Sequence, residues 1–247
     1  MLFEREGKYP QITEAGLALY DSAKVVVDST ERFAFSARQL SKGIPATLVM
    51  GIDEDLPLAP FSELFHSVQK RWPNLNLVLK RQAAPKLFKE VKNSNVHIAI
   101  TPTLQGSSQF YEFRAVGQWP YKMACGADHE LSRSRNITND QLAAFTQILP
   151  TSLDPNSPFM QTQKMSPYTW LAEGYDSLCS LLKANIGWAF LPVYGSDLPE
   201  GVKEIFPEFS LVDMHMQYDI IWPKGQRTTE LHHCIIDQVH AAFSQRV

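Results

Sequence analysis

The sequence has few cysteines, no long apolar run and little net charge, and each shortage excludes a class of protein. Its three cysteines, Cys125, Cys179 and Cys234, lie too far apart for a disulfide framework or a zinc motif. No apolar run reaches the ~18 residues of a membrane span, and the charged N-terminus lacks the apolar core of a secretory signal. We therefore expect a cytoplasmic protein with buried thiols, no metal and no membrane contact.

The charge balance and the missing catalytic motifs exclude further classes. The formal net charge is −3 and the pI is about 6.2. Binding to nucleic acid needs clustered Lys and Arg, so these residues are not expected to bind it by themselves. There is no Gly-rich phosphate loop, no Gly-x-Ser-x-Gly elbow and no Cys–His pair at a recognisable spacing. We expect neither an enzyme nor a bound cofactor.

What the sequence does contain is a long amphipathic helix near its start, predicted over residues 13–40. Thr13 is a suitable N-cap, and Lys42-Gly43 with Pro45 is a typical stop. Apolar and small residues recur at alternating steps of four and three, at Leu19, Ala23, Val26, Thr30, Phe33, Ala37 and Leu40. This narrow heptad seam favours a dimer contact between two helices. The alternative is a helix packed on its own domain, which usually has a wider apolar stripe.

The next hundred residues alternate between strand and helix patterns. Strands are predicted over residues 47–52, 75–79 and 96–100, and helices over 57–71 and 86–93. This order predicts right-handed βαβ units and a parallel sheet, in which ligands bind beyond the carboxyl ends of the strands. Those ends are Asp53-Glu54-Asp55, Arg81-Gln82 and Thr101-Pro102.

The second half of the chain shows the same alternation between two long extended stretches, residues 113–124 and 214–222. Thr138 and Gln141 form a predicted capping box at a helix start. Strands are expected at 147–149 and 187–192, with an extended segment at 168–170. Helices are expected at 175–184, where Asn185 follows in the left-handed region, and at 228–243.

The N-terminal pattern resembles a known family. Leu2-Phe3-x-Arg5 looks like the end of a hairpin that turns near Gly7, and Ile12-Thr13-x-Ala15-Gly16 then starts the long helix. This motif resembles the LysR-type transcriptional regulators, in which the last wing of a winged helix-turn-helix runs into a dimerising linker helix. The resemblance implies that the helices that read DNA, roughly the first ~55 to 60 residues of such a protein, are absent here.

The block 47–100 also resembles the effector domain of that family, although Ser94 and His97 stand where the family usually has Gly and Asp. The resemblance implies an α/β fold of two Rossmann-like lobes joined by two crossover strands, as in type 2 periplasmic binding proteins. Residues 1–12 would be the remnant of the DNA-binding wing and 13–43 the linker helix. Lobe one would comprise 46–119 and 221–247, and lobe two 120–220.

The function that the resemblance implies is ligand-responsive control of transcription. A small-molecule effector would bind between the lobes, promoter DNA would bind through the missing module, and the assembly would be a homodimer or homotetramer. The rival interpretation is a solute-binding protein of a transporter with the same two lobes. Such a protein needs a signal peptide or lipid anchor, and it has no use for the heptad helix.

By the same resemblance, effector contacts are expected at the strand ends and neighbouring loops, namely Asp53, Glu54, Gln82, Thr101, Pro102, Thr151, Ser152 and Phe190. The family often has Ser or Thr at the first of these positions. Here Asp53-Glu54-Asp55 would repel an anionic ligand, so we hypothesise a cationic, neutral or amine-bearing effector. Alternatively, the three acids cap the following helix or pair with Lys80 and Arg81.

Two other clusters contain residue types that can bind metal ions. His233, Asp237 and His240 share one face of the last predicted helix, which is typical of a solvated face and only secondarily of a metal site. The acidic triplet lacks the Gly-rich loop that would accompany a magnesium–phosphate site.

Overall fold

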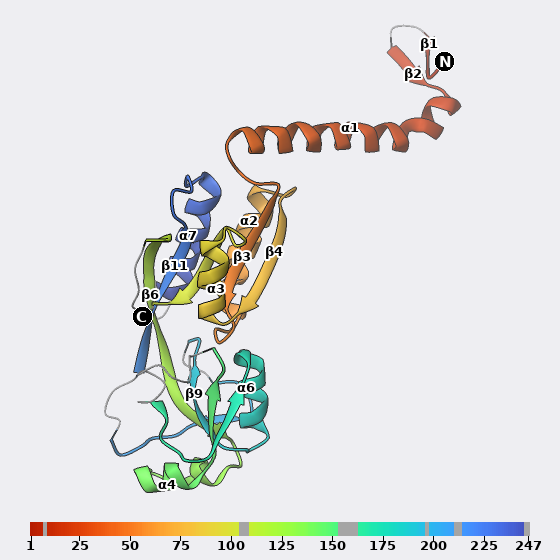
Figure 1. Ribbon diagram of the computed structural model, residues 1–247. Coiled ribbons are helices and arrows are strands. Elements are labelled where there is room, and N and C mark those ends of the chain that lie inside the picture. Colours follow the sequence, from red (N-terminus) through yellow and green to blue (C-terminus); the bar gives the residue numbers. More distant parts are fainter. Residues whose placement is uncertain (7–8, 104–108, 153–162, 196–197, 210–213, 245–247) are drawn as a thin grey trace. The chain divides into compact units, whose positions relative to one another are not determined.

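The computed structural model describes residues 1–6, 9–103, 109–152, 163–195, 198–209 and 214–244. The chain divides into two compact units, Met1–Ala46 and Thr47–Val247, each described here by itself (Figure 1). Within the described residues, no helix is both long and apolar enough to cross a membrane.

The first unit is a hairpin followed by one long helix. Strands β1 (Phe3–Glu6) and β2 (Tyr9–Ile12) pair antiparallel, as the motif predicts. The expected turn at Gly7 lies outside the described residues. Helix α1 spans Glu14–Ser41, and its N-cap is Thr13, whose hydroxyl accepts a bond of 3.1 Å from the amide of Gly16. A Cβ on Gly16 would collide with the carbonyl oxygen of Leu2, so the first helical turn requires glycine there.

Helix α1 exposes its apolar side chains. Gly16 is its one buried residue among those described. All seven residues of the heptad seam are exposed, and Val26 and Phe33 are 65% and 75% exposed. With 28 residues the helix is about 42 Å long. The seam is therefore available over the whole length of the helix.

The second unit is built on one nine-stranded sheet with the order β4-β3-β5-β11-β6-β9-β7-β8, and β10 pairs with β6. Three parallel strands form the sheet of lobe one, β3 (Thr47–Asp53), β4 (Asn76–Gln82) and β5 (Ile98–Pro102). Three more form lobe two, β7 (Gln147–Pro150), β8 (Thr169–Ala172) and β9 (Trp188–Pro192). These two sets confirm the predicted α/β architecture of two Rossmann-like lobes.

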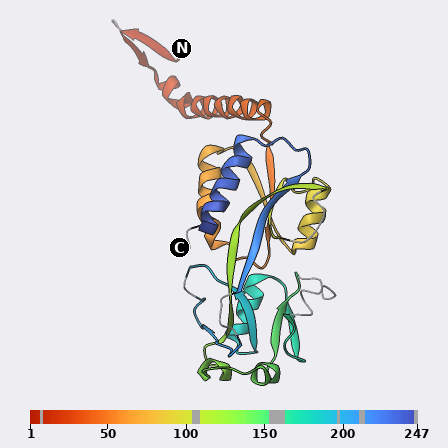
Figure 2. The same ribbon diagram turned by 90° about the vertical axis from the view of Figure 1, so that its left-hand side faces the viewer.

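Helices cover both faces of lobe one. Helices α2 (Ser62–Arg71) and α7 (Glu230–Ser244) lie on one face, and α3 (Ala84–Lys92) lies on the other (Figure 2). The helix predicted from residue 57 is interrupted, because the segment before α2 is a 3₁₀ turn, Ala59–Phe61, that contains Pro60. A 3₁₀ turn suits a proline in the first turn, where the missing N–H is not needed.

Lobe two follows the predictions closely and adds short elements. Helix α4 (Asn139–Ala144) begins with the predicted capping box, since Thr138 and Gln141 exchange bonds of 3.2 and 2.9 Å. Helix α6 (Gly174–Lys183) ends before Asn185, whose φ of 58° confirms the left-handed prediction. The 3₁₀ turn η2 (Glu130–Arg133) and strand β10 (Val202–Glu204) were not predicted. Ser94, which replaces a glycine of the family, also has a φ of 58°.

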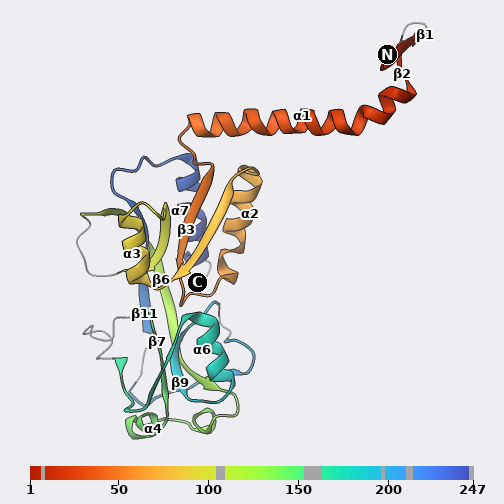
Figure 3. The ribbon, with the colours of Figure 1, turned by 45° about the vertical axis from the view of Figure 1, so that its right-hand side comes forward.

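Two long strands run through both lobes, β6 (Tyr111–Gly126) and β11 (Met214–Pro223) (Figure 3). They pair antiparallel with each other, β11 also pairs with β5 of lobe one, and β6 also pairs with β9 of lobe two. The register shifts beside Tyr218, where Val116 is an extra residue of β6. The Val116 carbonyl lies 3.1 Å from Nδ1 of His240 on α7, so the last helix stabilises this bulge.

The lobes have separate hydrophobic cores. In lobe one, Leu87, Val91 and Val96 pack with Ala99 and Ile221, whereas lobe two has two clusters of its own around Leu182 and Trp188. The three cysteines are buried free thiols, as expected. Burial raises the pKa of the Cys125 thiol from 9.0 to about 11. Each lobe thus has packing of its own, and the two long strands β6 and β11 connect them.

Candidate ligand-binding site

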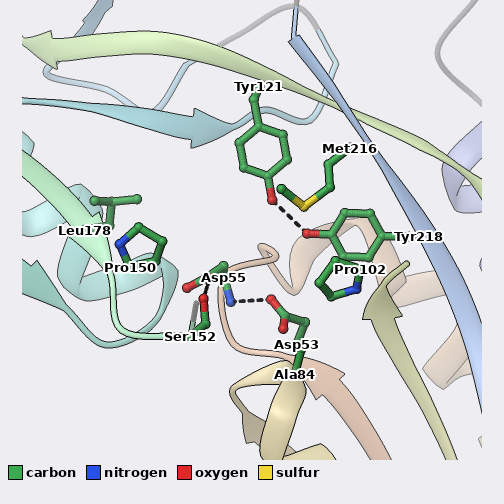
Figure 4. Close-up of a pocket in the computed structure, with 10 residues that line it drawn as sticks. All are labelled: Asp53, Asp55, Ala84, Pro102, Tyr121, Pro150, Ser152, Leu178, Met216 and Tyr218. Carbon is green, nitrogen blue, oxygen red and sulfur yellow. Dashed lines mark hydrogen bonds between the residues drawn. The ribbon is translucent and has the colours of Figure 1, made fainter. Parts of the chain in front are cut away.

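A small cavity lies where the two lobes and the two long strands meet (Figure 4). Its volume is about 30 Å³, which is enough for roughly two water molecules and far below the ~300 Å³ of sites for drug-sized ligands. Its walls come from ten residues, Asp53, Asp55, Ala84, Pro102, Tyr121, Pro150, Ser152, Leu178, Met216 and Tyr218. An organic ligand of ordinary size can enter only if the lobes separate.

The strand ends explain why polar groups collect here. Asp53 ends β3, Pro102 ends β5, and Ser152 follows β7, so residues from three parallel strands of the two lobes meet at their carboxyl ends. Polar side chains at this edge are expected of an open α/β sheet.

The turn Asp53-Glu54-Asp55 places buried carboxyl groups in this region. Asp53 is 1% exposed, and its Oδ1 accepts a bond of 3.1 Å from the amide of Asp55. Its Oδ2 has no hydrogen-bond partner among the described residues. Burial raises the pKa of Asp53 well above its ordinary value, and the charge of Asp55 raises it further. Burial likewise raises the pKa of Asp55 to about 6, although a bond from Ser152 opposes the rise.

Two hydrogen bonds join this turn to lobe two. The hydroxyl of Ser152 donates to Oδ2 of Asp55, and the amide of Tyr175, in the first turn of α6, donates to the carbonyl of Glu54 at 2.9 Å. The second bond lies beside Gly174, which has a φ of 76° and approaches the backbone of Glu54. The acidic turn is thus a point of attachment between the lobes.

Arg81 holds the backbone of the turn without forming an ion pair with its acids. Its Nη2 donates to the carbonyls of Glu54 and Leu56 at 2.6 and 2.5 Å. Lys80 pairs instead with Glu90 at 2.8 Å. The expected pairing of the acids with Lys80 is therefore wrong, and the Arg81 charge acts on them only through space, lowering their pKa values against the larger effect of burial.

The acids also do not cap the following helix. Helix α2 begins at Ser62, well after the turn, and its N-cap residue Phe61 makes no side-chain capping bond. The reason is the intervening 3₁₀ turn, which displaces the start of the helix. The carboxyl groups of the turn thus neither cap α2 nor pair with Lys80.

A tyrosine pair closes the opposite side of the cavity. The phenol oxygens of Tyr121 on β6 and Tyr218 on β11 lie 2.7 Å apart, and both side chains are buried. Burial raises both pKa values, so both phenols stay neutral. One hydroxyl hydrogen is used between them, which leaves the other available to a ligand or to water.

The structure brings some of the sequence-predicted site residues to the cavity and others only near it. Asp53, Pro102 and Ser152 line the cavity. Glu54 and Gln82 lie beside Asp53, since Gln82 is its partner in the strand register and Glu54 is the next residue. Thr101 is buried at the end of β5, with no partner for its hydroxyl among the described residues.

Two predicted residues lie elsewhere. Thr151 is exposed, and Phe190 packs against the core of lobe two, 6.1 Å from the ring of Trp188. Seven lining residues were not among the predicted effector contacts, namely Asp55, Ala84, Tyr121, Pro150, Leu178, Met216 and Tyr218. Tyr121 and Tyr218 could have been found from the sequence, because each is a tyrosine within one of the two extended stretches predicted to cross between the lobes.

The last helix carries its predicted solvated face. His233, Asp237 and His240 are exposed on α7. Across the part of the chain that the structure describes, no group of three His, Cys, Asp or Glu side chains is arranged to hold a metal ion.

Comparisons with known proteins find a matching family and several structures of similar fold. The family model of the LysR substrate binding domain matches residues 41–244. The HTH-type transcriptional regulator AceR of Acinetobacter baumannii is 21% identical over 194 residues, which are 77% of this chain and 64% of AceR. The chain thus spans a little less than two thirds of the length of this curated relative.

Solved structures of similar fold include three examples. The reduced OxyR regulatory domain from Pseudomonas aeruginosa has a TM-score of 0.63 at 14% identity, covering 81% of this chain and 98% of that one. The effector binding domain of QuiR in complex with shikimate has a TM-score of 0.63 at 13% identity, covering 81% and 99%. A full-length OxyR variant from P. aeruginosa has a TM-score of 0.63 at 15% identity, covering 97% and 84%.

Proposed function

The chain belongs to the LysR substrate-binding domain family, and from this we propose that it is the ligand-sensing part of a transcriptional regulator whose effector binds between the two lobes. The observation that carries this proposal is the cavity at the lobe boundary, where a buried carboxylate oxygen of Asp53 has no partner among the described residues. A buried polar atom without a partner is costly, so a ligand that completes its bonding is favoured.

The proposed mechanism is a ligand-biased equilibrium between lobe arrangements. The lobes have separate cores, and two described hydrogen bonds join the acidic turn to lobe two. An effector that fits one arrangement better shifts the population toward it, by no more than its difference in affinity for the two. The end of β3 carries acidic residues instead of Ser or Thr, and their negative charge would repel an anion. The proposed effector is therefore not a simple anion.

The wider assembly follows from the family and from helix α1. We propose a homodimer or homotetramer that forms through the seam of Leu19, Ala23, Val26, Thr30, Phe33, Ala37 and Leu40, whose side chains are exposed. Promoter DNA would bind through a winged helix-turn-helix of which β1 and β2 are the final wing. The regulator acts in the cytoplasm and performs no catalysis.

The solute-binding protein is the weaker alternative. It shares the two-lobed fold, but a 28-residue helix with an exposed heptad seam serves no purpose in a monomeric solute binder. The relatives also favour a regulator, since AceR is named a transcriptional regulator and the OxyR chains are regulatory domains.

DNA binding by the complete gene product tests the proposal. We expect an in-frame helix-turn-helix segment upstream of the Met1 codon, and tight binding of the DNA upstream of the gene that weakens steeply with salt. Fluorescence anisotropy would compare this DNA with unrelated DNA of equal length. Equal affinity for the two DNAs, or the absence of such a segment, would contradict the proposal.

A pair of variants links DNA binding to the cavity. Ala84 lines the cavity and is 2% exposed, so Ala84→Leu would fill the space. Ala144 is exposed on α4, and Ala144→Leu is the matched control. Only the first substitution should change the DNA affinity, because only it alters how the lobes close.

A further inference from the structure

The charged residues that line the cavity are of one sign. Asp53 and Asp55 are the two acidic residues among the ten that line the cavity, and none of the ten is Lys, Arg or His. The neighbouring Arg81 directs its Nη2 to two backbone carbonyls, and Lys80 pairs with Glu90. An anionic ligand would face carboxyl groups with no lining cation, whereas a cation would replace the solvation that burial has removed from them.

The acceptor geometry calls for a ligand with several donors. Asp53 Oδ2 is buried without a partner among the described residues. Asp53 and Asp55 line the same cavity as Tyr121 and Tyr218, and the Asp55 carboxyl is directed toward Ser152 (Figure 4). A protonated amine has three N–H donors and no acceptor, and these acceptors suit such a group.

The remaining walls select an organic cation over a metal ion. Pro102, Pro150, Leu178 and Met216 contribute apolar surface on the sides of the cavity. A hard metal ion requires six or more oxygen ligands, whereas an alkyl group gains free energy by contact with these side chains.

We propose that the cavity, once widened by separation of the lobes, is the binding site for a small organic ammonium ion, with its charged nitrogen between the carboxyl groups of Asp53 and Asp55 and its carbon chain against the apolar walls. This inference rests on the proposed function, because it names the effector class of the same cavity. The ammonium group competes with the hydroxyl of Ser152 for Asp55, so binding replaces a direct bond between the lobes with one that passes through the ligand.

The probes are three compounds with the same chain length and different charge, n-butylamine, 1-butanol and butyrate. Each would be added to the complete gene product at pH 7.5 and constant ionic strength, with binding followed by calorimetry and by the unfolding temperature. We expect n-butylamine to raise the unfolding temperature by a few degrees at millimolar concentration, while the alcohol and the carboxylate have little effect. Stabilisation by butyrate or 1-butanol that equals or exceeds that by the amine would overturn the proposal, as would no response to any of the three.

Substitutions of Asp53 and Asp55 test whether the amine binds at these two side chains. Asp53→Asn and Asp55→Asn keep the size of the side chains, and we expect the double variant to bind n-butylamine at least tenfold more weakly. Glu63→Gln removes an exposed carboxylate from the same lobe and is the matched control. The unfolding temperature without ligand confirms that each variant is folded. Amine binding that survives in the double variant would overturn the assignment.

Failure here is distinguishable from failure of the proposed function. A protein that binds its upstream DNA specifically but ignores amines remains a regulator with another effector class. A protein that binds amines through Asp53 and Asp55 but shows no specific DNA affinity keeps the ligand assignment and loses the regulator.

Discussion

Helix α1 and the acidic turn of lobe one depart in opposite ways from the usual distribution of residues. The helix exposes large apolar side chains, such as Val26 at 65% and Phe33 at 75%, where polar groups are normal. The turn buries carboxyl groups, such as Asp53 at 1% exposed, where apolar groups are normal. Neither arrangement stabilises the isolated chain. Under our proposals, each becomes favourable when another component is supplied, a second helix in one case and a ligand in the other.

The exposed apolar side chains of α1 and the buried carboxyl groups of the turn also differ in what would stabilise them. Exposed apolar surface is removed from water by any complementary apolar face, so the helix needs shape and register. A buried acid requires compensating charge or hydrogen-bond donors, so the turn needs a specific chemistry. The following predictions test whether each departure serves the component assigned to it.

The largest effect is expected on α1, where three consecutive valines provide an internal comparison. Val26 lies on the seam, and Val25 and Val27 lie about 100° to either side of it around the helix axis. Val25 is 61% exposed, Val26 is 65% exposed and Val27 is 56% exposed. Val26→Glu would bury two unpaired carboxylates in each dimer and should weaken the dimer by at least ~4 kcal/mol, about a thousandfold. Sedimentation equilibrium measures the change.

The neighbouring valines decide what the result means. Val25→Glu and Val27→Glu add the same charge at similar exposure, so they should weaken the dimer much less. If all three variants dissociate equally, or if the unsubstituted protein is already monomeric, the seam is not the contact.

The next largest effect is on the pH dependence of stability. A carboxyl group with a raised pKa keeps its proton in the folded chain after the unfolded chain has lost it, so stability falls as the pH rises. For Asp55, whose pKa is raised to about 6, the loss runs from about pH 4 to about pH 6 and amounts to at most ~3 kcal/mol. Asp55→Asn should abolish that loss and be more stable than the unsubstituted protein at pH 7.

Urea unfolding at several pH values measures this difference. Glu63→Gln removes a carboxylate whose side chain is 77% exposed, and it should leave the pH dependence unchanged. If the free energy of unfolding changed with pH equally in Asp55→Asn and in the unsubstituted protein, the burial of Asp55 would not destabilise the folded chain.

The tyrosine pair should show a smaller effect. Tyr121→Phe or Tyr218→Phe leaves one buried hydroxyl without its 2.7 Å partner and should cost ~1 to 2 kcal/mol. The double variant removes both hydroxyl groups and should cost less than the sum of the two. A double-mutant cycle in urea gives the coupling energy, and simple additivity would contradict a direct bond between the phenols.

The smallest effect is expected at the bond between the lobes. Ser152→Ala removes the hydroxyl that donates to Asp55 and should cost about 1 kcal/mol. Because that bond lowers the pKa of Asp55, the same substitution should raise this pKa further and move the loss of stability to higher pH. NMR titration of the Asp55 carboxyl carbon would detect the shift, and an unchanged titration would contradict a hydrogen bond from Ser152 to Asp55.

Much of the fold could be predicted because its signals are local. The Thr138–Gln141 capping box, the left-handed Asn185 and the N-cap Thr13 each depend on a few neighbouring residues, and all three are confirmed. The start of α2 was wrong because a proline in a first turn is compatible with both an α-helix and a 3₁₀ turn, and only packing distinguishes them.

The cavity could be predicted only in part. The rule of strand carboxyl ends locates Asp53, Pro102 and Ser152, since each follows from a strand that is readable in the sequence. The hydrogen bond between Tyr121 and Tyr218, which are 97 residues apart, depends on the register of β6 against β11, in which Gly117 is the partner of Tyr218 and Met214 the partner of Tyr121. Periodicity specifies which face a residue occupies, and it does not specify which distant residue lies opposite.

The burial of all three native thiols makes the lobe movement accessible to spectroscopy. Thiol reagents react with the exposed thiolate, and Cys125, Cys179 and Cys234 offer little of it. Cysteines introduced at Glu63 on α2 and Asp140 on α4, both exposed, would therefore take up a pair of spin labels selectively without removal of the native residues. The distance distribution between the labels would then report the populations of open and closed lobes in solution, one ligand at a time.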